Sequence, residues 1–334
     1  MIHQANLSVE SQWQKELKQS FTRPEELLDF LTLPSDQFAE DIKARKLFNM
    51  RVPRHFAPLI EQCNAQDPIL LQVLPNHQEF IEKIGFEPDP LQEHEAKVPG
   101  LLHKYKSRVL IMFRTGCAIN CRYCFRREFP YAENSVNKEK LKQTLDYMSK
   151  DKHINEVIFS GGDPLMADDD SIKWFIEQCE SITQLKRIRI HTRLPVVIPS
   201  RITESLLGTL ERSRLKPIIV LHINHANEIS DELKQACHKI VKSGITSLNQ
   251  AVLLKNINDT GTAQVKLSES LFDANILPYY LHLLDKVTGV THFEVSADKV
   301  KTIYDEMLAE LPGFLVPKLV REVGGESSKT PVLP

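Results

Sequence analysis

The stretch RVLIMFRTGCAINCRYC, residues 108–124, joins a continuously apolar segment to a cluster of cysteines. Residues 109–113 are all apolar and do not alternate with polar residues, a pattern typical of a strand that is buried on both faces. Cys117, Cys121 and Cys124 follow with the spacing C-x₃-C-x₂-C. We therefore predict a buried strand whose carboxyl end leads directly into a group of thiols.

Further segments downstream repeat the buried-strand pattern, and helix-like stretches separate them. The predicted strands are 108–113, 155–160, 186–192, 217–223, 248–254 and 276–283. The predicted helices between them are 138–150, 170–182, 203–212, 230–243 and 262–274. Because crossovers of this length join parallel strands, we predict an α/β fold in the form of a partial, open (β/α)6 barrel. In such barrels the reactive residues lie on the loops at the carboxyl ends of the strands.

The segments before and after the alternating strands and helices show different patterns. Residues 1–100 carry helical patterns interrupted by prolines and show no strand rhythm, which predicts an N-terminal helical wrapper. Residues 101–296 form the predicted barrel core. Residues 297–334 are expected to form a C-terminal segment with a helix at 298–311, then a strand and a Gly–Ser-rich loop.

The composition excludes several classes of function. The 334 residues carry a formal net charge of −2, so the chain lacks the basic field that nucleic-acid binding requires. The longest apolar stretches are too short to span a bilayer, and the first residues lack the apolar core of a secretory leader. We therefore expect a cytoplasmic protein with no membrane or nucleic-acid partner, whose six cysteines form no disulfide framework.

The cysteine spacing favours an iron–sulfur cluster. Closely spaced thiolates select iron–sulfur clusters, zinc or copper, and a usual cubane takes four cysteines. A local set of three leaves one iron without a protein ligand and open to a small molecule. Two alternatives remain: a structural zinc site completed by a histidine, in a non-catalytic barrel, or three unrelated thiols. Structural zinc ligands usually come as two separated pairs, and the sequence has no second pair.

The segment CAINCRYC (117–124) resembles the signature of the radical S-adenosylmethionine superfamily. The predicted partial barrel is also similar to the fold of that family. The resemblance implies a 4Fe–4S cluster on the three cysteines, S-adenosyl-L-methionine on the open iron, and an electron donor such as a flavodoxin or ferredoxin. The segment SGGDPL (160–165) looks like the family's glycine-rich strand end, which implies that Gly161, Gly162 and Asp163 approach the adenosylmethionine.

Several further stretches are similar to lysine 2,3-aminomutases. They are HKYKSRVLI (103–111), CRYCFRR (121–127), HTRLPVVIPSRIT (191–203), HINHANEI (222–229), LNQAVLLKNIND (248–259), ILPYYLHLLD (276–285) and GGESSKTPV (324–332). The resemblance implies conversion of (S)-α-lysine to (R)-β-lysine, with pyridoxal 5'-phosphate as a further cofactor. It is strongest to the branch whose β-lysine modifies translation elongation factor P, so that factor and its lysyl-ligase are implied functional partners.

The same resemblance assigns the cofactor-binding residues. It implies that Lys329 holds pyridoxal phosphate covalently, a bond that only an amine can form. Arg108 and Tyr105 resemble positions that hold the phosphate and the ring of this cofactor. His222 and Gln250 match residues that line the adenosylmethionine site. The structural alternatives are a solvated lysine near a terminus, an arginine flanking a strand, and a His and Gln that are merely satisfied in a core.

Three charged residues are assigned to the substrate by the resemblance. Arg126 resembles an arginine that binds the lysine carboxylate as a bidentate fork. Asp285 and Glu322 resemble two acids that receive the ε-ammonium group. One arginine and two acids fit a zwitterion that carries a distal cation. The alternatives are a helix or turn cap for Asp285 and a surface charge for Glu322.

Three departures from the family pattern bear on the physiological role. Glu322 stands where an aspartate is usual in enzymes that act on free lysine, and the tract before Lys329 is GGESS. The chain also stops at Pro334 without the C-terminal extension of those larger enzymes. These departures favour the elongation-factor branch, with a metabolic free-lysine aminomutase as the alternative.

Overall fold

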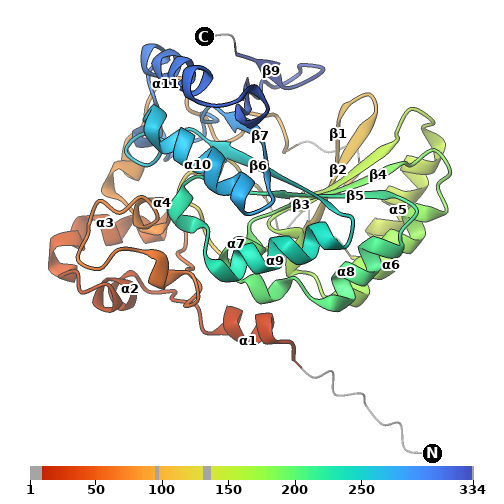
Figure 1. Cartoon of the computed structure of the whole chain (residues 1–334), viewed down its shortest axis with the longest axis horizontal. Helices are drawn as coiled ribbons and strands as arrows, with labels where there is room; N and C mark the ends of the chain where they lie inside the picture. Colours follow the sequence, from red (N-terminus) through yellow and green to blue (C-terminus); the bar gives the residue numbers. More distant parts are fainter. Residues whose placement is uncertain (1–9, 95–97, 131–136, 333–334) are drawn as a thin grey trace, which may run out of the picture.

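The computed structural model describes residues 10–94, 98–130 and 137–332, and one open nine-stranded sheet organises this part of the chain (Figure 1). The strands are β1 (Leu101–Tyr105), β2 (Arg108–Arg114), β3 (Glu156–Gly161), β4 (Arg187–Thr192), β5 (Lys216–Leu221), β6 (Thr246–Val252), β7 (Leu277–His282), β8 (Lys318–Arg321) and β9 (Thr330–Pro331). They follow one another across the sheet in sequence order. Strands β2 to β8 are parallel, and β1 and β9 are antiparallel at the two edges. The predicted α/β partial barrel is confirmed.

The six predicted strands are present as β2 to β7, each within two residues of its expected bounds. The strand expected in the C-terminal segment is β8, which lengthens the parallel part of the sheet beyond the six predicted units. The prediction missed β1, in which Tyr105 pairs with Arg108 of β2, because LLHKY mixes apolar and charged residues without a period. Strand β5 ends at Leu221, so His222 lies just beyond the strand and not on it as predicted.

Helices follow most of the parallel strands. They are α5 (Lys138–Lys150), α6 (Asp169–Glu180), α7 (Leu194–Val197), α8 (Glu204–Arg212), α9 (Asp231–Lys242), α10 (Gly261–Asp273) and α11 (Ala297–Glu310). Figure 1 shows α6, α8 and α9 on the same side of the sheet. Capping sets their starts: Ser230, for example, accepts a hydrogen bond from the Leu233 amide at 3.1 Å. None of the described helices is long and apolar enough to cross a membrane.

The N-terminal region carries short helices and packs on the barrel. They are α1 (Gln12–Lys18), α2 (Pro24–Phe30), α3 (Ala39–Lys43) and α4 (Leu70–Val73). Leu28 and Phe56 of this region belong to the same hydrophobic cluster as Ile111 and Phe159 of the barrel, so the core is continuous. The predicted region boundaries at residues 100 and 296 stay predictions. Residues 1–9, which belong to the stretch expected to lack the apolar core of a leader, lie outside the described residues.

An aromatic layer packs between the first parallel strands and α6. The Phe113 ring of β2 stacks on the Phe159 ring of β3 with 5.0 Å between centroids, and Phe175 of α6 packs on Phe159 at 5.4 Å. Because successive side chains of a strand point to opposite faces, this outer layer leaves the alternate residues of the same strands on the inner face. That inner face holds the candidate site.

Candidate active site

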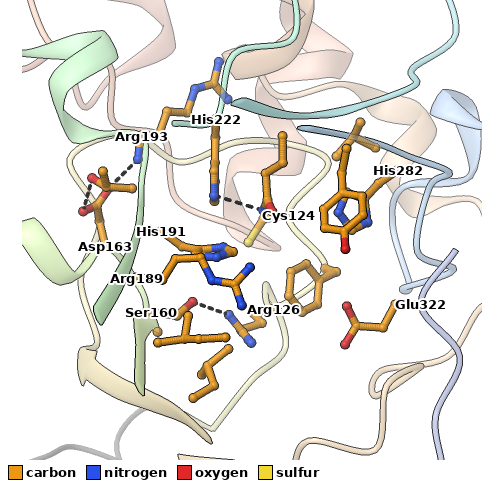
Figure 2. A pocket seen from close by; sticks show the side chains of 18 of the residues that line it. Cys124, Arg126, Ser160, Asp163, Arg189, His191, Arg193, His222, His282 and Glu322 are labelled. Carbon is orange, nitrogen blue, oxygen red and sulfur yellow. Dashed lines mark hydrogen bonds between the residues drawn. The ribbon is translucent and has the colours of Figure 1, made fainter. Parts of the chain in front are cut away.

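A cavity of about 520 Å³ runs along the inner face of the open sheet. Alternate strand residues line it, as the pleat requires. They include Glu156, Ile158 and Ser160 of β3, Arg187, Arg189 and His191 of β4, Leu248, Gln250 and Val252 of β6, and Tyr280 and His282 of β7. Figure 2 shows side chains from these strands converging on one space.

The cavity reaches far beyond the loops at the carboxyl ends of the strands. Arg108 begins β2 and Cys117 follows its end, and both line the cavity. The strand between them, Arg108–Arg114, is about 20 Å long. The cavity therefore extends beyond the strand-end loops on which the reactive residues are predicted to lie. A closed eight-stranded barrel fills its interior with side chains, whereas this open sheet leaves its inner face accessible.

The three clustered cysteines lie together at the carboxyl end of β2, where all three line the cavity. Arg51 donates a hydrogen bond to the Cys117 carbonyl at 2.9 Å, so the N-terminal region holds the loop. Burial raises the pKa of Cys117 well above its usual value, and burial raises the pKa of Cys124 to about 11. Because a buried thiolate needs a compensating cation, the loop is suited to bind a metal centre.

A buried carboxylate fixes the arginines on either side of Cys124. Glu79 accepts hydrogen bonds from Arg122 Nε at 2.8 Å and from Arg127 Nη2 at 2.7 Å. All three charged side chains are almost completely buried. Arg122 also donates to the Phe48 carbonyl at 2.7 Å. The N-terminal region therefore clamps the cysteine loop through buried ion pairs.

Gly161 and Gly162 end β3 against the segment that leads into the cysteine loop. Gly161 has a φ of +115°, and a Cβ there would lie 2.4 Å from the Arg114 carbonyl oxygen. A Cβ at Gly162 would lie 2.5 Å from the Gly116 carbonyl oxygen. No larger residue fits at either position. The packing of the chain on itself therefore requires both glycines, which also line the cavity.

Asp163 ties the end of β3 to the end of β4. Its carboxylate accepts hydrogen bonds from the Thr192 hydroxyl at 2.7 Å and from the Arg193 and Leu194 amides at 2.8 and 2.9 Å (Figure 2). Burial raises the pKa of Asp163, and these hydrogen bonds oppose the rise. The Asp163 carboxylate thus holds the ends of β3 and β4 together, a role that the sequence did not reveal.

Lys329, Glu322 and Tyr105 meet on one side of the cavity. The Lys329 ammonium lies 2.5 Å from one carboxylate oxygen of Glu322, and the Tyr105 hydroxyl donates to the other oxygen at 3.3 Å. Burial raises the pKa of Glu322, but the charges of Lys329 and Lys104 outweigh burial and hold this pKa at about 2. The Arg108 guanidinium lies over the Tyr105 ring, 4.1 Å from its centroid. The structure therefore brings these predicted site residues together.

Asp285 lines the same cavity, but its carboxyl group holds its proton more tightly than that of Glu322. Burial raises the pKa of Asp285 to about 7, and the negative charge of Glu322 adds to the rise. Its Oδ1 atom is buried and has no hydrogen-bond partner among the described residues. A buried acid with an unused oxygen is suited to receive a cationic group from a ligand.

Arg126 is engaged by a buried glutamate that the sequence did not reveal. Its Nε and Nη2 atoms donate to the two oxygens of Glu93 at 2.6 and 3.1 Å. Its Nη1 atom donates to the Ser160 hydroxyl at 3.1 Å (Figure 2). A ligand carboxylate would therefore have to share this guanidinium with Glu93 and Ser160 or displace them. Glu93 lies in a segment without period or motif, so no local signal could have found it.

His222 and Gln250 contact each other at the end of β5 and on β6. Their Nε2 atoms are 3.0 Å apart. Burial lowers the pKa of His222 to about 3, so the ring is neutral at physiological pH and accepts a hydrogen bond from the amide. Gln250 Oε1 is buried without a partner in the described part of the chain. A buried acceptor without a partner in a cavity wall indicates a position where a bound ligand could donate a hydrogen bond.

Comparison with known proteins agrees with these features. The Radical SAM superfamily profile matches residues 111–265. An L-lysine 2,3-aminomutase of Escherichia coli strain K12 is 49% identical over 99% of this chain and 98% of its own length. An L-lysine 2,3-aminomutase of Haemophilus influenzae is 50% identical over 96% of this chain and 95% of its own length. This chain belongs to the lysine 2,3-aminomutase family.

Other members of the family and the solved structures are more distant. The L-lysine 2,3-aminomutase of Clostridium subterminale is 30% identical over 96% of this chain and 78% of its own length. A radical SAM methyltransferase from Sphaerobacter thermophilus superimposes with a TM-score of 0.49 at 14% identity, covering 67% of this chain and 71% of that one. Streptococcus suis SuiB gives a TM-score of 0.48 at 16% identity, covering 65% and 49%.

Lysine 2,3-aminomutases are isomerases that use a 4Fe–4S cluster, S-adenosyl-L-methionine and pyridoxal 5'-phosphate. The cavity of this family member fits that set, because it presents three thiols, a lysine amine, and two buried atoms, Gln250 Oε1 and Asp285 Oδ1, that have no hydrogen-bond partner among the described residues. Within the described residues, no group of three or more His, Cys, Asp or Glu side chains stands ready to hold a metal ion. In a cubane each cysteine binds a different iron, so a cluster requires no such convergence on one point.

Proposed function

We propose that this chain is an L-lysine 2,3-aminomutase that converts (S)-α-lysine to (R)-β-lysine. The observation that carries the proposal is that the clustered thiols, Lys329, Arg126 and Asp285 all line one cavity. Relatives of that name, 49 and 50% identical over nearly the whole chain, support it.

The thiol end of the cavity would hold the cluster and the adenosylmethionine. The residues proposed there are Cys117, Cys121, Cys124, Gly161, Gly162, Asp163, His222 and Gln250. When bound, these groups supply the radical chemistry that removes a hydrogen atom from the substrate. Asp163 fixes the strand ends that face them. The neutral His222 and the Gln250 oxygen, which has no partner among the described residues, offer hydrogen bonds without adding charge.

The opposite end would hold pyridoxal phosphate, with Lys329 as the covalent anchor and Arg108 and Tyr105 at its phosphate and ring. The bound cofactor supplies an electron sink and carries the migrating amino group. Glu322, ionised at neutral pH, pairs with the Lys329 ammonium and fixes its position. The Lys329 amine must lose its extra proton before it can act as a nucleophile.

Charged groups would orient lysine between these two ends. Arg126, aimed by Glu93 and Ser160, is proposed to bind the α-carboxylate. Asp285 and Glu322 are proposed to receive the ε-ammonium group. Orientation at both ends places the α-nitrogen and the β-carbon at a fixed position in the cavity, which is how binding lowers the entropic part of a barrier.

Replacement of Lys329 tests the cofactor assignment. Lys329→Ala should abolish aminomutase activity and the visible absorbance of bound cofactor, because the anchoring amine is lost, yet keep the iron and sulfide content. Lys318→Ala, at an exposed position of β8, is the matched control and should change neither. The assignment is wrong if borohydride still traps cofactor on the chain of the Lys329→Ala variant.

We further propose that the β-lysine product is attached to translation elongation factor P by its lysyl-ligase. The reaction is proposed to take place in the cytoplasm, and a flavodoxin or ferredoxin is proposed to supply the aminomutase with electrons. Glu322 and the GGESS tract, which depart from the pattern of free-lysine enzymes, support this role. Hydrolysed elongation factor P from cells that lack this chain should contain no β-lysine, and (R)-β-lysine in the medium should restore it. An unchanged β-lysine content without the chain would contradict the role.

A further inference from the structure

A buried arginine contacts one of the clustered thiols. The Nη1 atom of Arg193 lies 2.8 Å from Cys121 Sγ and also contacts the Tyr123 hydroxyl. The Arg193 side chain is 5% exposed. Figure 2 shows its backbone beside Asp163, with the guanidinium extending away from that carboxylate. The contact between the guanidinium and the sulfur is therefore direct and shielded from water.

Further buried groups fix the guanidinium in this place. Its Nη2 atom donates to Glu228 Oε2 at 2.8 Å and to Gln72 Oε1 at 2.9 Å. Glu228 is completely buried, and its other oxygen accepts from the Asn224 and His225 amides at 3.0 Å each. Arg193 cannot move away without leaving the Glu228 charge unpaired in the interior, which is strongly unfavourable.

We propose that Arg193 is a positioning residue that raises the reduction potential of the 4Fe–4S cluster, and that Glu228 opposes this effect. The inference rests on the proposed role of Cys121 as a cluster ligand. Hydrogen bonds to the sulfurs and the local net charge set the potential of such clusters.

The direction of the effect follows from the charge that reduction adds. A low-potential one-electron donor transfers one electron to the cluster, and no bond forms or breaks in that step. The extra negative charge spreads onto the ligand sulfurs, so a cationic donor at Cys121 Sγ stabilises the reduced cluster more than the oxidised one. The Glu228 carboxylate contacts the same guanidinium and partly cancels its charge.

The proposal predicts that Arg193→Gln and Glu228→Gln shift the reduction potential of the cluster in opposite directions. The measurement is an anaerobic redox titration of the reconstituted protein, followed by the electron paramagnetic resonance signal of the reduced cluster. Arg193→Gln should lower the equilibrium constant for reduction about tenfold, which is about 59 mV for one electron. Glu228→Gln leaves the arginine charge uncancelled and should shift the potential in the positive direction. The double variant should lie between the two single variants.

Two further variants separate this role from a merely structural one. Arg193→Lys keeps the charge and should retain most of the parent potential. Arg189 also lines the cavity, but the contacts described for its guanidinium are with Glu156 and Tyr279 and not with a clustered thiol, so Arg189→Gln should not shift the potential. Unshifted potentials for Arg193→Gln and Glu228→Gln, or shifts of the same sign, overturn the proposal. A parent protein without any iron–sulfur signal would instead overturn the cluster assignment itself.

Discussion

Asp285 and Glu322 line the same cavity, yet their surroundings give them different charges. The pKa of Glu322 is about 2, because the charges of Lys329 and Lys104 outweigh burial, whereas burial raises the pKa of Asp285 to about 7. The folded protein therefore holds the Asp285 proton more tightly than the unfolded chain, whose carboxyl has a pKa near 3.8. The contribution of Asp285 to stability falls as pH rises through the window from about 4 to 7.

The fall of kcat/KM for lysine at acidic pH, the acid limb of the pH profile, should follow the protonation of Asp285. Because the ε-ammonium group needs the ionised carboxylate, kcat/KM for lysine should fall as pH drops below about 7. Asp285→Asn keeps the shape but removes the charge, so it should abolish this limb. It should also weaken transition-state binding of lysine by about 1.5–3 kcal/mol, and that of norleucine, which lacks the ε-amine, by less. The measurement is kcat/KM of both substrates across neutral pH; equal losses on both would mean that Asp285 is structural.

At the scale of elements, the N-terminal region and the cysteine loop form one unit through Glu79. Glu79→Gln leaves the buried guanidinium groups of Arg122 and Arg127 without a charge partner. The variant should lower the free energy of unfolding by about 3–5 kcal/mol and lose iron to a chelator faster than the parent. Urea unfolding and the rate of iron release measure the two effects.

Glu294→Gln is the matched control for that variant. Glu294 pairs with Lys83 and Lys286, whose side chains are about half exposed, so its replacement should cost less than about 1 kcal/mol. If the Glu79 and Glu294 variants lose the same stability and release iron at the same rate, the clamp has no role in holding the loop.

The elements also differ in how far local sequence determines them. Strands β2 to β7 could be predicted because each is an apolar run between helix-forming stretches, and the start of α9 follows from the Ser230 cap. By contrast, Glu79 and Glu93 find their arginine partners 43 and 33 residues away along the chain. Such pairings depend on how the N-terminal region packs on the barrel, which no local pattern encodes. The roles of Lys329 and Arg126 came from family resemblance alone.

At the scale of the whole molecule, side chains bridge the gap that the open sheet leaves. Strands β1 and β8 lie near opposite edges of the sheet. Tyr105 and Lys104 of β1 nevertheless contact Glu322, which follows β8, at 3.3 Å each. The barrel is thus completed by polar contacts between side chains that line the cavity, and not by backbone pairing. This arrangement sets the thiol loop and Lys329 around a single cavity of about 520 Å³.

The fate of the α-nitrogen of lysine decides whether this chain catalyses the 2,3-amino shift. Reconstituted protein would be incubated anaerobically with a reductant, S-adenosylmethionine, pyridoxal phosphate and L-lysine that carries ¹⁵N at the α-position, and the product analysed by NMR. We expect β-lysine with the label on the amino group of the β-carbon, and no product from the Cys121→Ala or Lys329→Ala variants. β-Lysine without the label, or no β-lysine from parent protein that carries a full complement of iron and both cofactors, would contradict it.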